Sequence, residues 1–302
     1  MMRPRLDFER EGRAWPHREA SRFVDAAGFR WHVQTMGDGP SLVLLHGTGA
    51  STHSFAQLAP RLAQRFRVIM PDLPGHAFSH DGGPDTLSTA GMAKAVAALL
   101  QALGESPPVV LGHSAGAAIA IRATLDGLVQ PKLIVSLNGA LLALRGVAGH
   151  LFAPMAKLMS FNWFMPWIFA SRAADESVID RLLQGTGSTV GADARTCYAT
   201  LARSPQHVSA AFGMMANWDL PGLERDLPKL RTKLLLVAGE RDHMIPPEQA
   251  THAAQLVKDA DVMTLPSVGH LLHEEAPDLV AGIIVRAAED AGALPKSEEP
   301  GR

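Results

Sequence analysis

The chain has 302 residues, a formal net charge of −2, 47% hydrophobic residues and a single cysteine, Cys197. This length fits one large α/β domain or two ordinary domains, and we expect one core with an insertion. The near-neutral charge and the lack of a long basic run argue against nucleic-acid binding, and one cysteine excludes an internal disulfide and is compatible with a reducing, cytoplasmic compartment.

The first half of the chain alternates strand-like and helix-like segments. Residues 1–20 are polar, lack the apolar core of a signal peptide and are expected to be poorly ordered. Apolar stretches on either side of Ala27-Gly28 predict an antiparallel hairpin. Strands at Ser41–Leu45, Arg67–Met70, Val109–Leu111 and Lys132–Leu137 then alternate with helices near 55–64, 86–103 and 115–123. This rhythm predicts an α/β fold with a mainly parallel, doubly wound sheet.

The strand Ser41–Leu45 is followed by His46-Gly47-Thr48-Gly49. Glycines leave this backbone free to turn its N–H groups toward a bound molecule. We expect the N–H groups of Thr48 and Ala115 to form an oxyanion hole. His46 is interpreted as a buried histidine that holds this loop, and not as a catalytic base.

The sequence Gly112-His113-Ser114-Ala115-Gly116 follows the apolar run Pro108–Leu111 and precedes an alanine-rich helical stretch. This is G-x-S-x-G in the strand–turn–helix context of a nucleophile elbow, which predicts a strained Ser114. The flanking glycines are expected because a Cβ atom there would crowd the neighbouring backbone. The alternative is a serine that only caps a helix in a glycine-rich turn. His113 is predicted to lie at the substrate pocket.

Residues 141–218 break the alternation and are predicted to form helices, with interruptions at prolines and glycines. The alternation resumes at Lys233. The predicted organisation is a flexible segment 1–20, an α/β core of 21–140 and 219–290, an inserted helical cap of 141–218, and a flexible tail of 291–302.

Six of the chain's 17 aromatic residues lie within Leu151–Phe169. Aromatic and methionine side chains line wide apolar pockets well, so this segment predicts a pocket above Ser114. Two alternatives remain: the rings pack the cap onto the core, or they contact a membrane surface. The candidate pocket residues are Phe152, Met155, Phe161, Trp163, Phe164 and Trp167.

Two polar residues follow the last predicted strands. Asp242 lies just beyond the strand Leu234–Ala238, and His270 follows the strand Val262–Leu265. A serine hydroxyl needs a base to become a nucleophile, and a carboxylate that orients that base completes the set. The order Ser114, Asp242, His270 is the one expected of this fold. The rivals are Asn138 and Asp219 for the acid, and His273, expected to face solvent, for the base.

These motifs resemble the α/β-hydrolase superfamily over nearly the whole chain. A narrower resemblance rests on Trp15–Val24, Trp31–Gly37, His46–Ser54 and Ser136–Leu141, which look like the magnesium-chelatase accessory proteins of bacteriochlorophyll biosynthesis. The resemblance implies Ser114 as nucleophile, Asp242 as acid and His270 as base. It also implies a role near magnesium insertion into protoporphyrin.

A serine at the elbow favours acyl-enzyme chemistry on esters, thioesters or amides, although some relatives with the same triad cleave carbon–carbon bonds. The resulting hypothesis is a serine hydrolase acting on a bulky apolar ester in magnesium-porphyrin metabolism. The alternative is a non-catalytic protein that binds a tetrapyrrole or contacts the chelatase on a hydrolase scaffold. No metal or other cofactor is expected, because the sequence lacks a Cys/His cluster, a P-loop and a dinucleotide fingerprint. We expect a cytoplasmic protein, with peripheral membrane contact through the cap as a further hypothesis.

Overall fold

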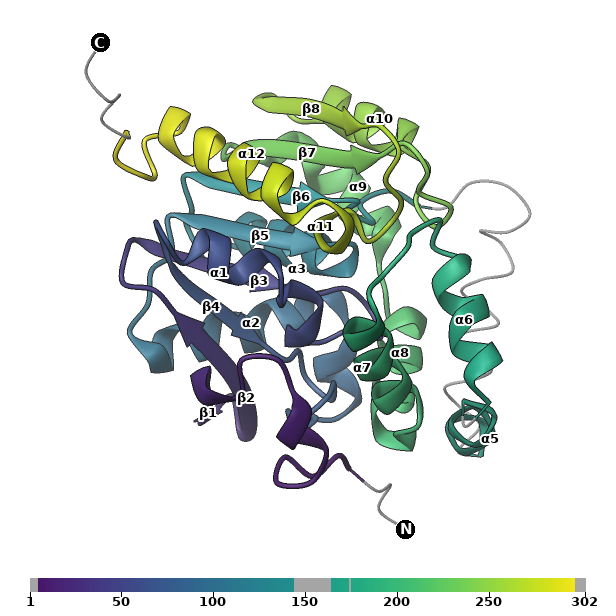
Figure 1. The fold of residues 1–302 in the computed structure, drawn as a ribbon. Helices are drawn as coiled ribbons and strands as arrows, with labels where there is room; N and C mark the ends of the chain where they lie inside the picture. Colours follow the sequence, from purple (N-terminus) through teal and green to yellow (C-terminus); the bar gives the residue numbers. More distant parts are fainter. Residues whose placement is uncertain (1–4, 144–163, 174, 297–302) are drawn as a thin grey trace.

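The computed structural model describes residues 5–143, 164–173 and 175–296, and these residues form one eight-stranded sheet (Figure 1). The strand order is β1-β2-β4-β3-β5-β6-β7-β8, with β1, β2 and β4 joined antiparallel and all other neighbours parallel. The α/β class, the mainly parallel sheet and the N-terminal hairpin are therefore confirmed. The strands are β1 (Ser21–Ala26), β2 (Phe29–Met36), β3 (Ser41–Leu45), β4 (Arg67–Pro71), β5 (Val109–His113), β6 (Leu133–Leu137), β7 (Lys233–Gly239) and β8 (Ala260–Leu265).

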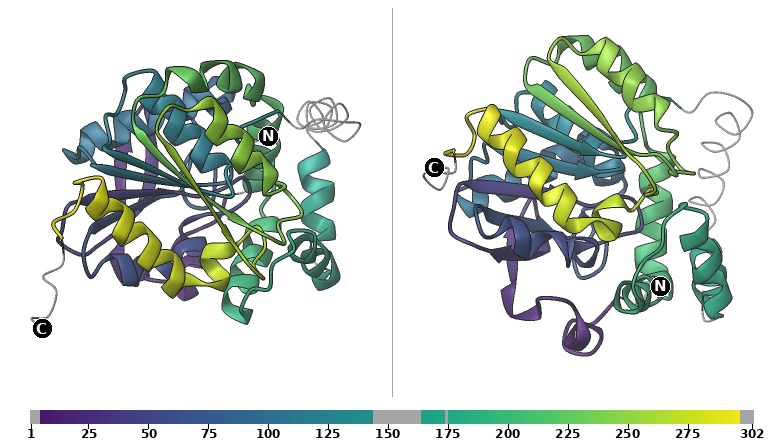
Figure 2. Two further views of the ribbon diagram at one scale, coloured as in Figure 1. Left: turned by 90° about the horizontal axis from the view of Figure 1, so that it is seen from above. Right: turned by 45° about the horizontal axis from the view of Figure 1, so that its top comes forward.

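Helices cover both faces of the sheet (Figure 2). Successive residues of a strand point to opposite faces, so Val43 packs with α2 and α3 on one side while Leu44 packs with α1 and α12 on the other. This explains why β3 is apolar throughout. The core helices are α1 (Leu58–Leu62), α2 (Thr89–Leu103), α3 (Ala115–Leu125), α9 (Leu220–Asp226), α10 (Glu248–Leu256), α11 (Leu272–Glu275) and α12 (Pro277–Asp290), and the short 3-10 helices are η1 (Glu11–Ala14), η2 (Arg18–Ala20), η3 (Thr52–Phe55), η4 (Pro84–Leu87) and η5 (Leu227–Lys229).

Both ends of the described chain, 5–20 and 291–296, are predicted from the sequence to be poorly ordered, yet each contains side chains that are buried against the core. Trp15 is buried against the ring of Phe78, and its indole N–H donates a hydrogen bond to Thr52 Oγ1 at 3.1 Å. At the other end, Ala293 and Leu294 are buried in the cluster beneath α12. Burial of these apolar side chains outweighs the polar composition around them.

Between β6 and α9 the described residues form helices and no strand: α5 (Met165–Arg172), α6 (Glu176–Gln184), α7 (Ala192–Ala202) and α8 (Pro205–Ala216). Figure 1 shows α6, α7 and α8 beside the carboxyl ends of the parallel strands. Side chains of α8 are buried on several sides, so this helix lies between the outer helices and the core. In the described ranges, no helix combines the length and the apolar character that crossing a bilayer requires.

Candidate active site

Ser114 occupies the sharp turn between β5 and α3. Its backbone has φ 50° and ψ −113°, a region that side-chain-bearing residues seldom adopt. The turn is held because Ser114 N–H donates to Leu137 O at 2.9 Å and Ser114 O accepts from Ala140 N at 3.1 Å. Backbone strain fixed in this way by its surroundings is typical of functional sites, and it is the strain that the G-x-S-x-G sequence predicted.

The glycines on either side of the serine are required by close backbone packing. A Cβ atom on Gly112 would lie 2.2 Å from Ala117 N, and one on Gly116 would lie 2.0 Å from Leu45 O. Both distances are far below van der Waals contact. The sequence-based explanation of these two glycines is confirmed.

Asp242 and His270 are joined beyond the ends of β7 and β8. His270 Nδ1 lies 2.8 Å from Asp242 Oδ2, and both side chains are buried. The other carboxylate oxygen accepts from Met244 N at 2.7 Å and Ile245 N at 2.9 Å. A carboxylate held this firmly fixes the Nδ1–H tautomer of the imidazole and leaves Nε2 free to accept a proton.

Within the part of the chain that the structure describes, no hydrogen bond joins Ser114 to His270. Catalytic hydrogen bonds are often long before substrate binds. His270 contacts the elbow through His113, the residue before Ser114. The centroids of the two imidazole rings lie 4.8 Å apart.

Asn138 holds the loop that carries His270. Its Nδ2 group donates to Gly269 O at 3.0 Å and to His270 O at 2.8 Å, while its Oδ1 accepts from Gly239 N at 2.7 Å. One amide thus ties the end of β7, which leads to Asp242, to the loop of the histidine. A side-chain amide offers two donors and an acceptor, whereas a carboxylate only accepts, so Asn138 supports the pair and does not replace its acid.

We expect Asn138→Asp to destabilise the fold by about 1–3 kcal/mol, because a carboxylate offers no donor to the carbonyls of Gly269 and His270. Urea unfolding at neutral pH measures this loss. Asp219→Asn is the matched control: Asp219 Oδ1 only accepts from Gly222 N at the start of α9, and an amide oxygen can do the same. Equal stability of the two variants would contradict the supporting role of Asn138.

His273 is fully buried, so the expectation that it faces solvent is wrong. The short helix α11 packs its inner side on η3, where His273 Nε2 lies 2.7 Å from Ser54 Oγ. Its neighbour Glu274 turns inward as well and accepts hydrogen bonds from Ser54 and Tyr198. Burial lowers the pKa of His273 to about 3 and keeps it neutral.

The structure places His113, a predicted pocket residue, behind the His270 loop. Its ring is buried, and Nε2–H donates to His270 O at 2.9 Å. Burial, with His273 and His270 nearby, lowers its pKa well below the usual range. His113 is therefore a neutral second donor to the carbonyl that Asn138 also holds.

The loop after β3 lies directly against the elbow. A Cβ atom on Gly47 would meet His113 Nδ1 at 2.9 Å and Ser114 Cβ at 3.1 Å. His46 is fully buried, donates from Nδ1 to Gly47 O at 2.8 Å and accepts from Leu73 N at 2.9 Å. Burial lowers its pKa to about 3. The interpretation of His46 as the histidine that holds this loop is confirmed.

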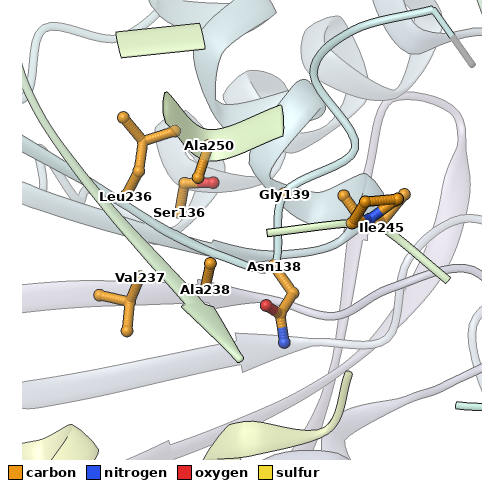
Figure 3. A pocket seen from close by; sticks show the side chains of 9 residues that line it. Ser136, Asn138, Gly139, Leu236, Val237, Ala238, Ile245 and Ala250 are labelled. Carbon is orange, nitrogen blue, oxygen red and sulfur yellow. The ribbon is translucent and has the colours of Figure 1, made fainter. Parts of the chain in front are cut away.

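Four candidate pocket residues, Phe152, Met155, Phe161 and Trp163, lie outside the described residues. Phe164 and Trp167 are 51% and 38% exposed at the start of α5, so their place in a pocket stays a prediction. A separate small cavity lies behind the acid loop, lined by Ser136, Asn138, Ile245 and neighbours (Figure 3). At about 10 Å³ it has room for one water molecule and not for a substrate.

Sequence reasoning missed Glu275 and the structural use of Asn138. Glu275 Oε2 accepts from Gly269 N at 2.7 Å, and Oε1 accepts from Thr189 N at 3.0 Å. A carboxylate five residues after a candidate base is a weak signal for such a contact, because the bond depends on how a short helix folds back on its own loop.

Comparison with known proteins agrees with the fold. The model of the Alpha/beta hydrolase family matches residues 42–283. The Magnesium-chelatase 30 kDa subunit of Rhodobacter capsulatus is 38% identical over 273 residues, which cover 90% of this chain and 95% of that protein. A pimeloyl-(acyl-carrier protein) methyl ester esterase of Xanthomonas campestris is 31% identical over 79% of this chain and 91% of its own length. The crystal structure of an alpha/beta hydrolase fold protein from Burkholderia ambifaria superposes with a TM-score of 0.74 at 23% identity, covering 94% of this chain and 100% of that one.

Proposed function

The chain belongs to the alpha/beta hydrolase family, and we propose that it is a serine hydrolase with Ser114 as nucleophile, His270 as base and Asp242 as acid. The observation that carries this proposal is the 2.8 Å Asp242–His270 pair, together with a strained serine next to His113, whose ring lies 4.8 Å from that of His270. The pair follows β7 and β8 at the edge of the sheet where the elbow also opens, whereas another buried imidazole–carboxylate pair, His32–Asp72, lies on β2 and after β4.

In this mechanism His270 Nε2 takes the proton of Ser114 as Oγ attacks the carbonyl carbon of an ester. The N–H groups of Thr48 and Ala115 stabilise the oxyanion. His270 returns the proton to the leaving alcohol as the acyl–enzyme forms, and water then releases the acid by the same steps. Asp242 stabilises the imidazolium in both halves.

We propose a bulky apolar ester as the substrate and a place near magnesium-porphyrin and bacteriochlorophyll biosynthesis. The similarity to a protein named as a magnesium-chelatase subunit supports the pathway, and a methyl ester esterase among the relatives supports ester chemistry. The aromatic and methionine content of segment 151–169 fits a substrate that is a flat macrocycle.

A second candidate function is a non-catalytic accessory that binds a tetrapyrrole, or the chelatase itself, on the hydrolase scaffold. The 38% identity to the chelatase-named protein favours it. In either case we place the protein in the cytoplasm, with peripheral membrane contact through the cap as part of the proposal.

Titration with protoporphyrin and with a magnesium-porphyrin methyl ester separates the two functions. We expect the ester to bind more tightly than a small acetyl ester, and its hydrolysis to vanish in Ser114→Ala while binding persists. Chromatography of the released acid and quenching of tryptophan fluorescence measure the two quantities. Tight binding without turnover in the wild type would favour the accessory role. Hydrolysis of small esters alone, with no tetrapyrrole affinity, would contradict the pathway.

A further inference from the structure

We propose that the insertion between β6 and β7 is a working part of the active site, with His207 of α8 as the positioning residue of the oxyanion loop. The inference rests on the proposed function, because it assigns the support of the same oxyanion hole. It goes beyond the expectation of a helical cap that lines a pocket above Ser114.

His207 joins the insertion to two core loops at once. Its Nδ1 accepts from Ala77 N at 3.0 Å, so the ring proton is on Nε2, which donates to Gly49 O at 3.0 Å. The side chain is buried, and its pKa lies well below the ordinary value because burial and His76 both disfavour a charge. A neutral ring with this tautomer is the form that serves both bonds.

Gly49 follows the residue whose N–H is proposed for the oxyanion hole. Its φ of +74° belongs to the left-handed region, where the peptide on either side of it can rotate easily. A fixed donor on its carbonyl therefore restricts the Thr48–Gly49–Ala50 backbone. Helix α8 touches this loop a second time, since Thr48 Oγ1 donates to Met214 Sδ at 3.4 Å.

The insertion also holds the loop of the proposed base. Thr186 O accepts from His270 N at 3.1 Å, and Ser188 Oγ accepts from Leu271 N at 2.8 Å. The two backbones pack so closely that a Cβ atom on Gly269 would lie 2.4 Å from the carbonyl carbon of Gly187. Any displacement of 186–216 would thus move both the base and the oxyanion loop.

Two substitutions test the two hydrogen bonds of His207 separately. In His207→Gln the amide nitrogen reaches the place of Nε2 and retains the donor to Gly49 O. In His207→Asn the amide oxygen replaces Nδ1, so the bond from Ala77 N survives and the bond to Gly49 is lost. His17→Asn is the control, because His17 Nε2 donates to Ala56 O, away from both catalytic loops.

We expect His207→Asn to lower kcat at least about tenfold with little change in KM, since a loosened oxyanion donor affects the transition state more than the bound ester. His207→Gln should recover most of this loss. Hydrogen exchange of the peptide 46–52 should rise in His207→Asn alone. Circular dichroism and thermal melting verify that both variants fold.

Equal kcat in the Asn and Gln variants, or unchanged exchange of 46–52 in His207→Asn, would overturn the positioning role. If the wild type hydrolyses no ester, the proposed function fails, and the exchange measurement still decides whether His207 holds the loop. Faster exchange in the His17→Asn control would also count against the proposal, because it would show a general loosening of the fold.

Discussion

Ser114→Ala should abolish both ester turnover and labelling by a fluorophosphonate, and His270→Ala should lower kcat by a factor on the order of 10⁶. Without the hydroxyl no acyl–enzyme forms, and without the imidazole the hydroxyl keeps its proton. Asp242→Asn should cost about 10⁴ in kcat, because an amide on Nδ1 favours the wrong tautomer and cannot stabilise imidazolium. Steady-state kinetics and mass spectrometry of the labelled protein measure these effects.

The stability of Ser114→Ala distinguishes a catalytic loss from an unfolded protein. The side chain of Ser114 makes no hydrogen bond that the elbow needs, since the turn is held through the backbone contacts with Leu137 and Ala140. We therefore expect the free energy of unfolding of Ser114→Ala to lie within about 0.5 kcal/mol of the wild-type value.

Ser136→Ala is the matched control for labelling. Ser136 is a buried serine one strand away, and its hydroxyl has no partner among the described residues. Its variant should label like the wild type. Labelling that persists in Ser114→Ala would place the nucleophile elsewhere. An active Asp242→Asn protein combined with an essential Asp219 would contradict the assignment of the acid.

The sequence was most informative where local pattern and topology coincide. Apolar runs such as Ser41–Leu45 must be strands buried on both faces, and parallel strands bring their following loops to one edge. The sequence alone therefore predicts that Ser114, Asp242 and His270 lie near one another. The strain at Ser114 followed from its glycine neighbours.

Long-range burial could not be predicted in the same way. His273 lies beside two glutamates, and only the docking of α11 on η3 shows that it points inward. Trp15 lies in a polar N-terminal segment, yet it is buried against the ring of Phe78. The hydrogen bonds of His207 link residues more than a hundred positions apart, and no local spacing announces them.

Because several histidines are buried in neutral form, we expect the protein to unfold cooperatively in mild acid. Burial lowers the pKa of His46, His53 and His273 to about 3 and that of His76 to about 4, and it holds those of His113 and His207 well below the usual range. An unfolded histidine titrates near pH 6.5. The folded state therefore binds fewer protons below that pH, and its stability falls as the pH falls from about 6.5 toward the folded pKa values.

Glu274 acts in the opposite direction. Burial raises the pKa of its carboxyl to about 7. The stabilisation of the fold by this protonated carboxyl is therefore complete below the unfolded-state pKa near 4.5 and is lost as the pH rises through 7. Between about pH 4.5 and pH 7, the proton that Glu274 releases on unfolding cancels the proton taken up by about one histidine. Unfolding should then take up about five protons, and stability should fall by about 7 kcal/mol per pH unit once unfolded histidines are charged.

A typical stability of about 5–15 kcal/mol would be exhausted within about two pH units below 6.5, which gives a midpoint near pH 5. Urea unfolding followed by circular dichroism at a series of pH values measures the slope. His76→Gln, which removes one buried imidazole, should reduce the proton uptake by about one, whereas the exposed His252→Gln should leave it unchanged. A protein that stays folded at pH 4, or a slope that is the same in both variants, would show that these histidines accept protons within the native fold.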